Sequence, residues 1–157
     1  MHALNHTLDQ KVLDADGRYL NTQELNALEQ YAQSYVNRME AYQQLRDRSR
    51  DLVTQALTKL GQAHIELMQK HKARCEYDMS ETLRYVALSI LRDDEVFFKE
   101  QMMSWLDTIL LAHKRHDQCA TAYRYLLDAI NADLPSTTSA LARPYFDGII
   151  LTLQSHA

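Results

Sequence analysis

The chain has 157 residues, a formal net charge of −4, and only three Gly and two Pro residues. This length predicts a single domain with a sizeable core, and the scarcity of Gly and Pro favours long helices over hairpins. The acidic balance argues against a general nucleic-acid binder, which normally carries a basic excess.

The sequence shows no pattern typical of a secreted or membrane-spanning protein. The N-terminal residues lack the basic region and apolar core of a signal peptide, and no run of about 18 apolar residues indicates a membrane span. The two cysteines, Cys75 and Cys119, form neither a C-x-x-C motif nor a disulfide framework. We therefore expect a cytoplasmic protein with reduced thiols.

The first half of the chain predicts a short amphipathic segment and one long helix. Residues 3–13 form the amphipathic segment, which ends before Gly17. Asn21 is an N-cap candidate with Glu24 three residues later, the pattern of a capping box. Apolar residues then recur at helical spacing: Leu25, Leu28, Ala32, Tyr35, Met39 and Tyr42. We expect the polar stretch 46–51 to interrupt this helix and Gly61 to end or bend it.

The second half predicts further helices and no strand. The expected helical segments are 62–91, 93–112 with an acidic first turn, 120–130, and a last helix capped by Thr138 or Ser139. A polar joint is expected at 113–118, and Pro144 must lie in the first turns of the last helix or kink it. The chain is thus an all-α domain of six or seven helices. Periodicity alone does not separate a bundle from a globin-like stack.

Two residue pairs are candidate functional groups. Cys75 and Asp78 lie three residues apart and share one face of the predicted helix; the alternative is a buried cysteine next to a solvated aspartate. His113 and His116 have spacing compatible with two metal ligands, or with two solvated imidazoles at a helix C-terminus. The chain has no Gly-rich phosphate loop, H-E-x-x-H motif or nucleophile elbow, and we expect that it is not an enzyme.

The segment Cys75-x-x-Asp78-Met79, followed by Leu83-Arg84-Tyr85-Val86, resembles the chromophore-bearing helix of the phycobiliproteins. Three further segments agree in order and spacing: Asp14-Ala15-x-Gly17 with Leu20 and Thr22, Asn37-Arg38-Met39-Glu40-Ala41, and Tyr145-Phe146-Asp147. The resemblance covers nearly the whole chain. It implies a globin-like (phycocyanin-like) domain over residues 1–157, with an N-terminal helical extension at 1–20 and a body at 21–157.

The resemblance also implies a function and a set of residues. The function is non-catalytic binding of a linear tetrapyrrole, a bilin such as phycocyanobilin or biliverdin, in a protein related to the light-harvesting subunits of phycobilisomes. Cys75 matches the bilin-attaching cysteine, Asp78 the aspartate that accepts from the two central pyrrole N–H groups, and Arg74 a basic residue that meets a propionate. Asp14 and Arg84 match a pair across the subunit interface, which implies a homodimer or a heterodimer with a related subunit.

Some positions depart from the family pattern. Tyr77 stands where many members have an arginine, Trp105 stands where a small residue is common, and Leu110 replaces a frequent tyrosine. The glycine-rich loop before the chromophore helix is absent. These departures resemble a divergent branch, the bilin-biosynthesis-associated globins. Two alternatives stay open: a pigment-free interaction or regulatory module, and a haem globin with His113 or His116 as iron ligand.

Overall fold

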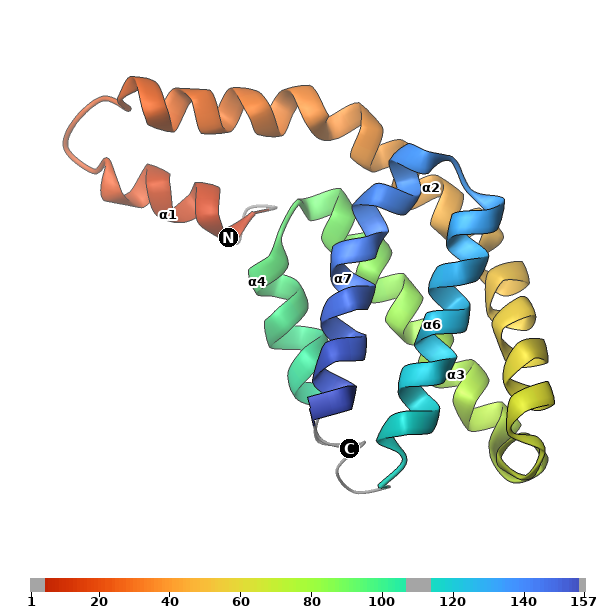
Figure 1. The fold of residues 1–157 in the computed structure, drawn as a ribbon. Coiled ribbons are helices and arrows are strands. Elements are labelled where there is room, and N and C mark those ends of the chain that lie inside the picture. Colours follow the sequence, from red (N-terminus) through yellow and green to blue (C-terminus); the bar gives the residue numbers. More distant parts are fainter. Residues whose placement is uncertain (1–4, 107–113, 156–157) are drawn as a thin grey trace.

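The computed structural model of the chain describes residues 5–106 and 114–155, and this described part contains helices and no strand (Figure 1). The elements follow in the order α1 (His6–Asp14), α2 (Thr22–Ala63), α3 (Ile65–Arg92), α4 (Glu95–Phe98), the π-helical η1 (Lys99–Met103), α6 (His116–Asp133) and α7 (Ser136–Ser155). The all-α fold class predicted from the sequence is confirmed. In the described residues, no helix has both the length and the apolar character needed to cross a membrane.

An N-terminal arm projects from a helical body. The arm consists of α1 and the first half of α2, which run antiparallel to each other (Figure 1). The second half of α2 enters the body and packs with α3, α6 and α7. The fold therefore has the extra helical pair ahead of a stack of helices that the resemblance implied.

Local hydrogen bonds set where the arm's two helices begin. The Asn5 side chain accepts from the backbone N–H of Leu8 at the start of α1. At the start of α2, Asn21 and Glu24 form the predicted capping box, with distances of 3.0 and 2.8 Å. Arg18 donates to both carboxylate oxygens of Glu24, and this bond, followed by the bond from the Asn21 backbone, lowers the pKa of Glu24 to about 2. The turn between the helices is thus fixed by side chains.

The long helix α2 is continuous, so the expectation that residues 46–51 interrupt it is wrong. Leu45 and Leu52 flank this polar stretch and are both fully buried, which keeps the apolar stripe in register. The charged residues between them lie on the outer face, where Arg48 pairs with Asp133 at 3.0 Å and with Asp51 at 3.4 Å. Leu45 and Leu52 are seven residues apart, which is about two helical turns, so a polar run between them is compatible with an unbroken amphipathic helix.

The boundaries of the later helices also differ from the expectations. Gly61 lies inside α2, which ends two residues after it, and α3 is kinked at His71, where φ is −134°. Asp94 caps α4, as the acidic segment predicted, but the helix passes into the π-helical η1. The last helix begins at Ser136, ahead of the predicted caps, and Pro144 lies in its interior. The end of the expected helix 93–112 lies outside the described residues.

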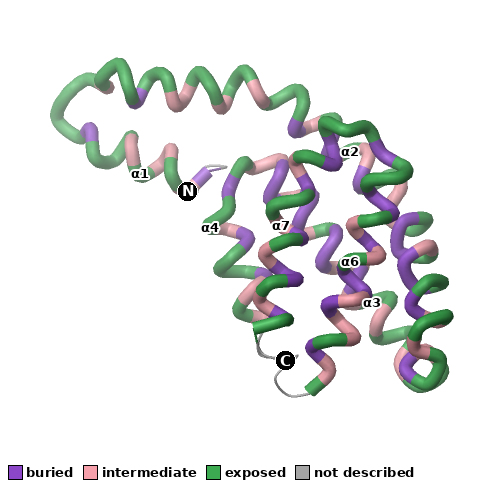
Figure 2. Tube along the Cα trace, viewed as in Figure 1, coloured by how far each residue is buried: buried purple, intermediate pink, exposed green. Residues whose placement is uncertain are grey.

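The core lies in the body and leaves the arm uncovered (Figure 2). Side chains with less than 2% exposure gather on the four long helices of the body, among them Leu45, Leu60, Leu83, Leu126, Phe146 and Ile149. On the arm, by contrast, Leu13 is 67% exposed, Tyr19 97% and Val36 56%. Burial of these arm residues would have to come from another molecule.

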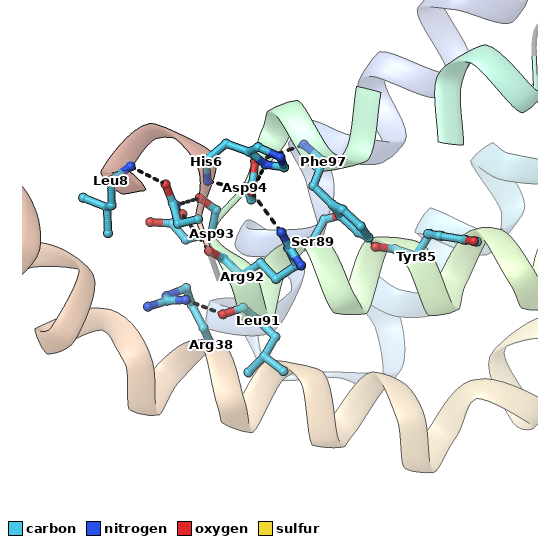
Figure 3. Close-up of polar contacts among 11 residues, drawn as sticks. His6, Leu8, Arg38, Tyr85, Ser89, Leu91, Arg92, Asp93, Asp94 and Phe97 are labelled. Atoms are coloured by element: carbon cyan, nitrogen blue, oxygen red, sulfur yellow. Dashed lines mark hydrogen bonds and ion pairs between the residues drawn. The ribbon is translucent and has the colours of Figure 1, made fainter. Parts of the chain in front are cut away.

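The N-terminal end of α1 is held at the turn between α3 and α4 (Figure 3). The Asn5 amide donates to two backbone carbonyls of that turn. The buried Asp94 accepts from the His6 backbone N–H at 3.0 Å, contacts His6 Nδ1 at 2.7 Å, and accepts from the Phe97 backbone N–H at 3.0 Å. One carboxylate thus both caps α4 and binds the arm.

Arg38 fixes α2 to the same region of the body (Figure 3). Its side chain is buried, donates to the Leu91 carbonyl on α3, and donates to the Tyr31 carbonyl at 2.7 Å. Its guanidinium also lies 4.1 Å from the centre of the Tyr31 ring. The arm is therefore attached to the body at both of its helices.

Candidate functional site

Cys75 and Asp78 line the same cavity, of about 110 Å³, between α3 and α6. This arrangement confirms that the two side chains share one face of a helix. The cavity is lined by Leu60, Leu67, His71, Arg74, Cys75, Asp78, Arg115, Gln118, Cys119 and Ala122. The cavity lining therefore combines two thiols, a carboxylate, two guanidinium groups and an imidazole with apolar leucine and alanine side chains.

One oxygen of the Asp78 carboxylate is occupied and the other is not. Arg74, one helical turn earlier, donates through Nε to Oδ2 at 2.9 Å. Oδ1 is buried and accepts no hydrogen bond from the residues that the structure describes. Buried carboxylate oxygens nearly always have a donor, so Asp78 presents a vacant acceptor position beside Cys75.

Both cysteines of the chain face this cavity, and both are free thiols. Burial raises the pKa of Cys75, and the negative charge of Asp78 raises it further. Burial raises the pKa of Cys119 to about 12, again with a contribution from the neighbouring acidic groups. Arg115 acts in the opposite direction on both sulfurs. Both thiols are therefore protonated at neutral pH.

Cys119 lies on a helix that packs beside Cys75, although the helix expected over 120–130 would have left it outside. That expected start is wrong, because α6 starts at His116. The predicted polar joint 113–118 is thus partly helical, and Cys119 occupies the first turn of α6. The missed site residues Arg115, Cys119 and Ala122 recur at helical spacing, a signal that a correctly placed helix start would have shown.

Of the two histidines, the structure describes His116, which is not a solvated imidazole at a helix C-terminus. His116 is buried and begins α6, which corrects that alternative, and His113 lies outside the described residues. Within residues 5–106 and 114–155, no group of three or more His, Cys, Asp or Glu side chains is placed to hold a metal ion.

The two predicted interface residues lie on different parts of the molecule. Asp14 ends α1 and accepts from Gln10 at 2.7 Å. Arg84 lies on α3, pairs with Glu81 at 2.7 Å, and stacks over the Tyr85 ring. Asp14 and Arg84 do not pair with each other within the chain, so their contact across an interface stays a prediction.

The N-terminal helical pair ahead of a body of stacked helices is the arrangement that the resemblance to the phycobiliproteins implied (Figure 1). The family model described as phycobilisome protein matches residues 11–153. The allophycocyanin alpha-B chain of Cyanidium caldarium is 30% identical over 157 aligned positions, which cover 88% of this chain and 93% of that relative. The chain belongs to the phycobilisome protein family.

This membership confirms the predicted resemblance and the globin-like fold of the body. It also confirms the predicted functional class, a bilin-binding protein related to light-harvesting subunits. Proteins of this family are generally non-catalytic carriers of linear tetrapyrroles that assemble with related subunits. The pigment, its contacts and the partner of this chain are addressed below as proposals.

Proposed function

We propose that the chain carries a linear tetrapyrrole on Cys75, oriented by Asp78, and that its arm docks on a second subunit. The observation that supports the first part is Oδ1 of Asp78 in the cavity of Cys75, which is buried and accepts no hydrogen bond from residues 5–106 and 114–155. A carboxylate there accepts pyrrole N–H donors and favours their protonated, cationic state. When bound, the tetrapyrrole supplies an extended conjugated system that absorbs visible light.

The cavity fits part of such a pigment. Its volume of about 110 Å³ is small beside the ~300–1,000 Å³ of typical ligand sites. The part of the tetrapyrrole next to Cys75 and Asp78 would lie in the cavity, and the rest of the pigment would lie on the protein surface at the cavity opening. Arg74 and Tyr77 are exposed on the adjoining face of α3, so Tyr77 can cover pigment where many relatives place an arginine.

Covalent attachment is tested by producing the chain in cells that make a bilin. We expect pigment that survives denaturation in the wild type and its loss in Cys75→Ala, with unchanged helicity by circular dichroism. Asp78→Asn should keep the pigment and shift its long-wavelength band to the blue, because an amide stabilises a cation less than a carboxylate does. Denaturation-resistant pigment in Cys75→Ala would refute the attachment site, and an unchanged spectrum in Asp78→Asn would refute the role of Asp78.

The small cavity favours one second candidate, a pigment-free interaction module that keeps the fold. The same experiment separates the candidates, since such a module would be isolated without pigment from a bilin-supplied host. A Soret band would instead indicate the haem alternative.

The exposed apolar side chains of the arm support the docking proposal. Tyr19, Leu25 and Val36 are each more than half exposed although they lie on ordered helices or their turn. A hollow of about 260 Å³ beside Arg84, lined also by Tyr42, is available to the arm of a second subunit. We propose a dimer with a related subunit or a second copy, with Asp14 of one arm facing Arg84 of the other chain. We also propose that residues 1–20 act as the N-terminal extension and residues 21–157 as the body, and that the protein is cytoplasmic.

A further inference from the structure

We infer that Arg115 binds a carboxylate in the cavity and makes the site select linear tetrapyrroles with a free propionate group. This inference rests on the proposed bilin site. It assigns the propionate contact to Arg115 at the start of α6, whereas the family resemblance implied Arg74 on α3.

The backbone of Arg115 is fixed by a hydrogen bond, whereas its side chain has no hydrogen-bond partner among the described residues. It is the N-cap residue of α6, with no side-chain capping bond, and its carbonyl accepts from the Cys119 N–H at 3.0 Å. The guanidinium lines the cavity and is only partly exposed. It makes no hydrogen bond or ion pair with any residue in the described ranges. Five N–H donors are therefore available to a ligand at this position.

The other cation of the cavity is already engaged. The Nε of Arg74 donates to Asp78, and its guanidinium lies 5.9 Å from the Tyr77 ring centre. A propionate that took Arg74 would compete with Asp78 for it. Arg115 offers its charge without that competition, so we assign Arg74 to positioning Asp78 and Arg115 to the ligand carboxylate.

The surroundings of Arg115 also favour an anion. Its charge lowers the pKa of both Cys75 and Cys119 against the effect of burial, which places the guanidinium near both sulfurs. The N-terminus of α6 adds a partial positive charge, and Gln118 brings an amide to the same lining. Asp117 opposes this potential from an exposed position, where solvent screens its charge.

The test compares biliverdin with its dimethyl ester, which has the same conjugated rings and no negative charge. Binding is measured by absorbance titration in a Cys75→Ser background, so that it stays reversible. We expect the acid to bind about tenfold more tightly than the ester, as for a charge-assisted hydrogen bond in a partly exposed site. Arg115→Gln should remove this preference and leave the affinity for the ester unchanged, whereas Arg115→Lys should keep part of it.

Arg124→Gln is the matched control. Arg124 lies nine residues later on the same helix, is exposed, and has no partner among the described residues, so its replacement makes the same change in net charge away from the cavity. The preference for the acid should be unaffected.

Each other result overturns the assignment. An equal loss of affinity for acid and ester in Arg115→Gln would show that Arg115 only supports the fold or Asp78. A preference that disappears in Arg74→Gln but persists in Arg115→Gln would assign the carboxylate to Arg74. If acid and ester bind equally to the Cys75→Ser protein, the role of Arg115 is refuted and the bilin site stands. If neither binds, both are refuted.

Discussion

The hydrogen bond between Thr82 and Tyr123 should determine how firmly the two helices of the cavity are held together. Thr82 lies on α3, one turn after Asp78, and Tyr123 lies on α6, one turn after Cys119. Both residues are buried, and their hydroxyl oxygens are 3.0 Å apart. The Thr82 hydroxyl also donates to the Asp78 backbone carbonyl at 2.8 Å. Its only proton is thereby used, so the Tyr123 hydroxyl is the donor to Thr82.

This assignment predicts unequal costs for removing the two partners. Tyr123→Phe removes the donor and leaves an acceptor that still makes another bond, so the free energy of unfolding should fall by about 1 kcal/mol. Thr82→Val leaves the Tyr123 hydroxyl as a buried donor without an acceptor, which should cost about 2 kcal/mol. In the double variant the donor is absent, so the loss should be about 1 kcal/mol smaller than the sum of the two.

The measurement is urea unfolding followed by circular dichroism at 222 nm, on all four proteins, with equal m values as the condition for comparing them. Thr82→Ser is the control, because it keeps the hydroxyl while removing a methyl group. Strictly additive losses would refute the bond as a link between α3 and α6. A larger loss for Tyr123→Phe than for Thr82→Val would refute the direction of donation.

Three further predictions concern the interface, the second thiol and alkaline stability. Asp14→Lys should weaken the dimer in analytical ultracentrifugation, and adding Arg84→Glu to that variant should partly restore it. A wild-type monomer at micromolar concentration would contradict the docking proposal. Cys119→Ala should leave the amount of denaturation-resistant pigment unchanged, because Cys75 is the cysteine that matches the attachment position and burial raises the pKa of the Cys119 thiol to about 12; a clear loss would show that Cys119 takes part in attachment. Burial raises the pKa of Tyr145 above 10, so the unfolded chain ionises first and stability should fall as pH rises above about 10. Tyr145→Phe should make that fall shallower in urea unfolding at pH 8 to 11, and an equally steep fall would rule out its contribution.

Features with a local cause could be predicted from the sequence. The capping box at Asn21 and Glu24 depends on residues three apart, and the shared face of Cys75 and Asp78 depends only on helical geometry. The family resemblance supplied what local patterns do not contain, namely the globin-like packing and the role of the arm.

Features that depend on contacts between distant segments could not be predicted in this way. The sequence does not show that α2 continues through residues 46–51, because the partner of Arg48 is Asp133, far along the chain. The start of α6 was placed too late because its first turn is polar, although His116 is buried there by tertiary packing. As a result, the sequence does not predict Cys119 and Arg115 at the cavity. The buried Oδ1 of Asp78, which has no donor among the described residues, can be identified only from the structure.

The continuity of α2 has a consequence for the geometry of assembly. One helix of 42 residues carries both the exposed apolar side chains of the arm and the buried leucines of the body. Each residue of a helix adds about 100° of rotation and about 1.5 Å of rise. A single residue inserted near Val36 would therefore turn the arm's contact face by about 100°, whereas an insertion of seven residues would return it to nearly its original direction about 10 Å further out. The length of α2 between arm and body thus sets the angle at which two subunits can meet.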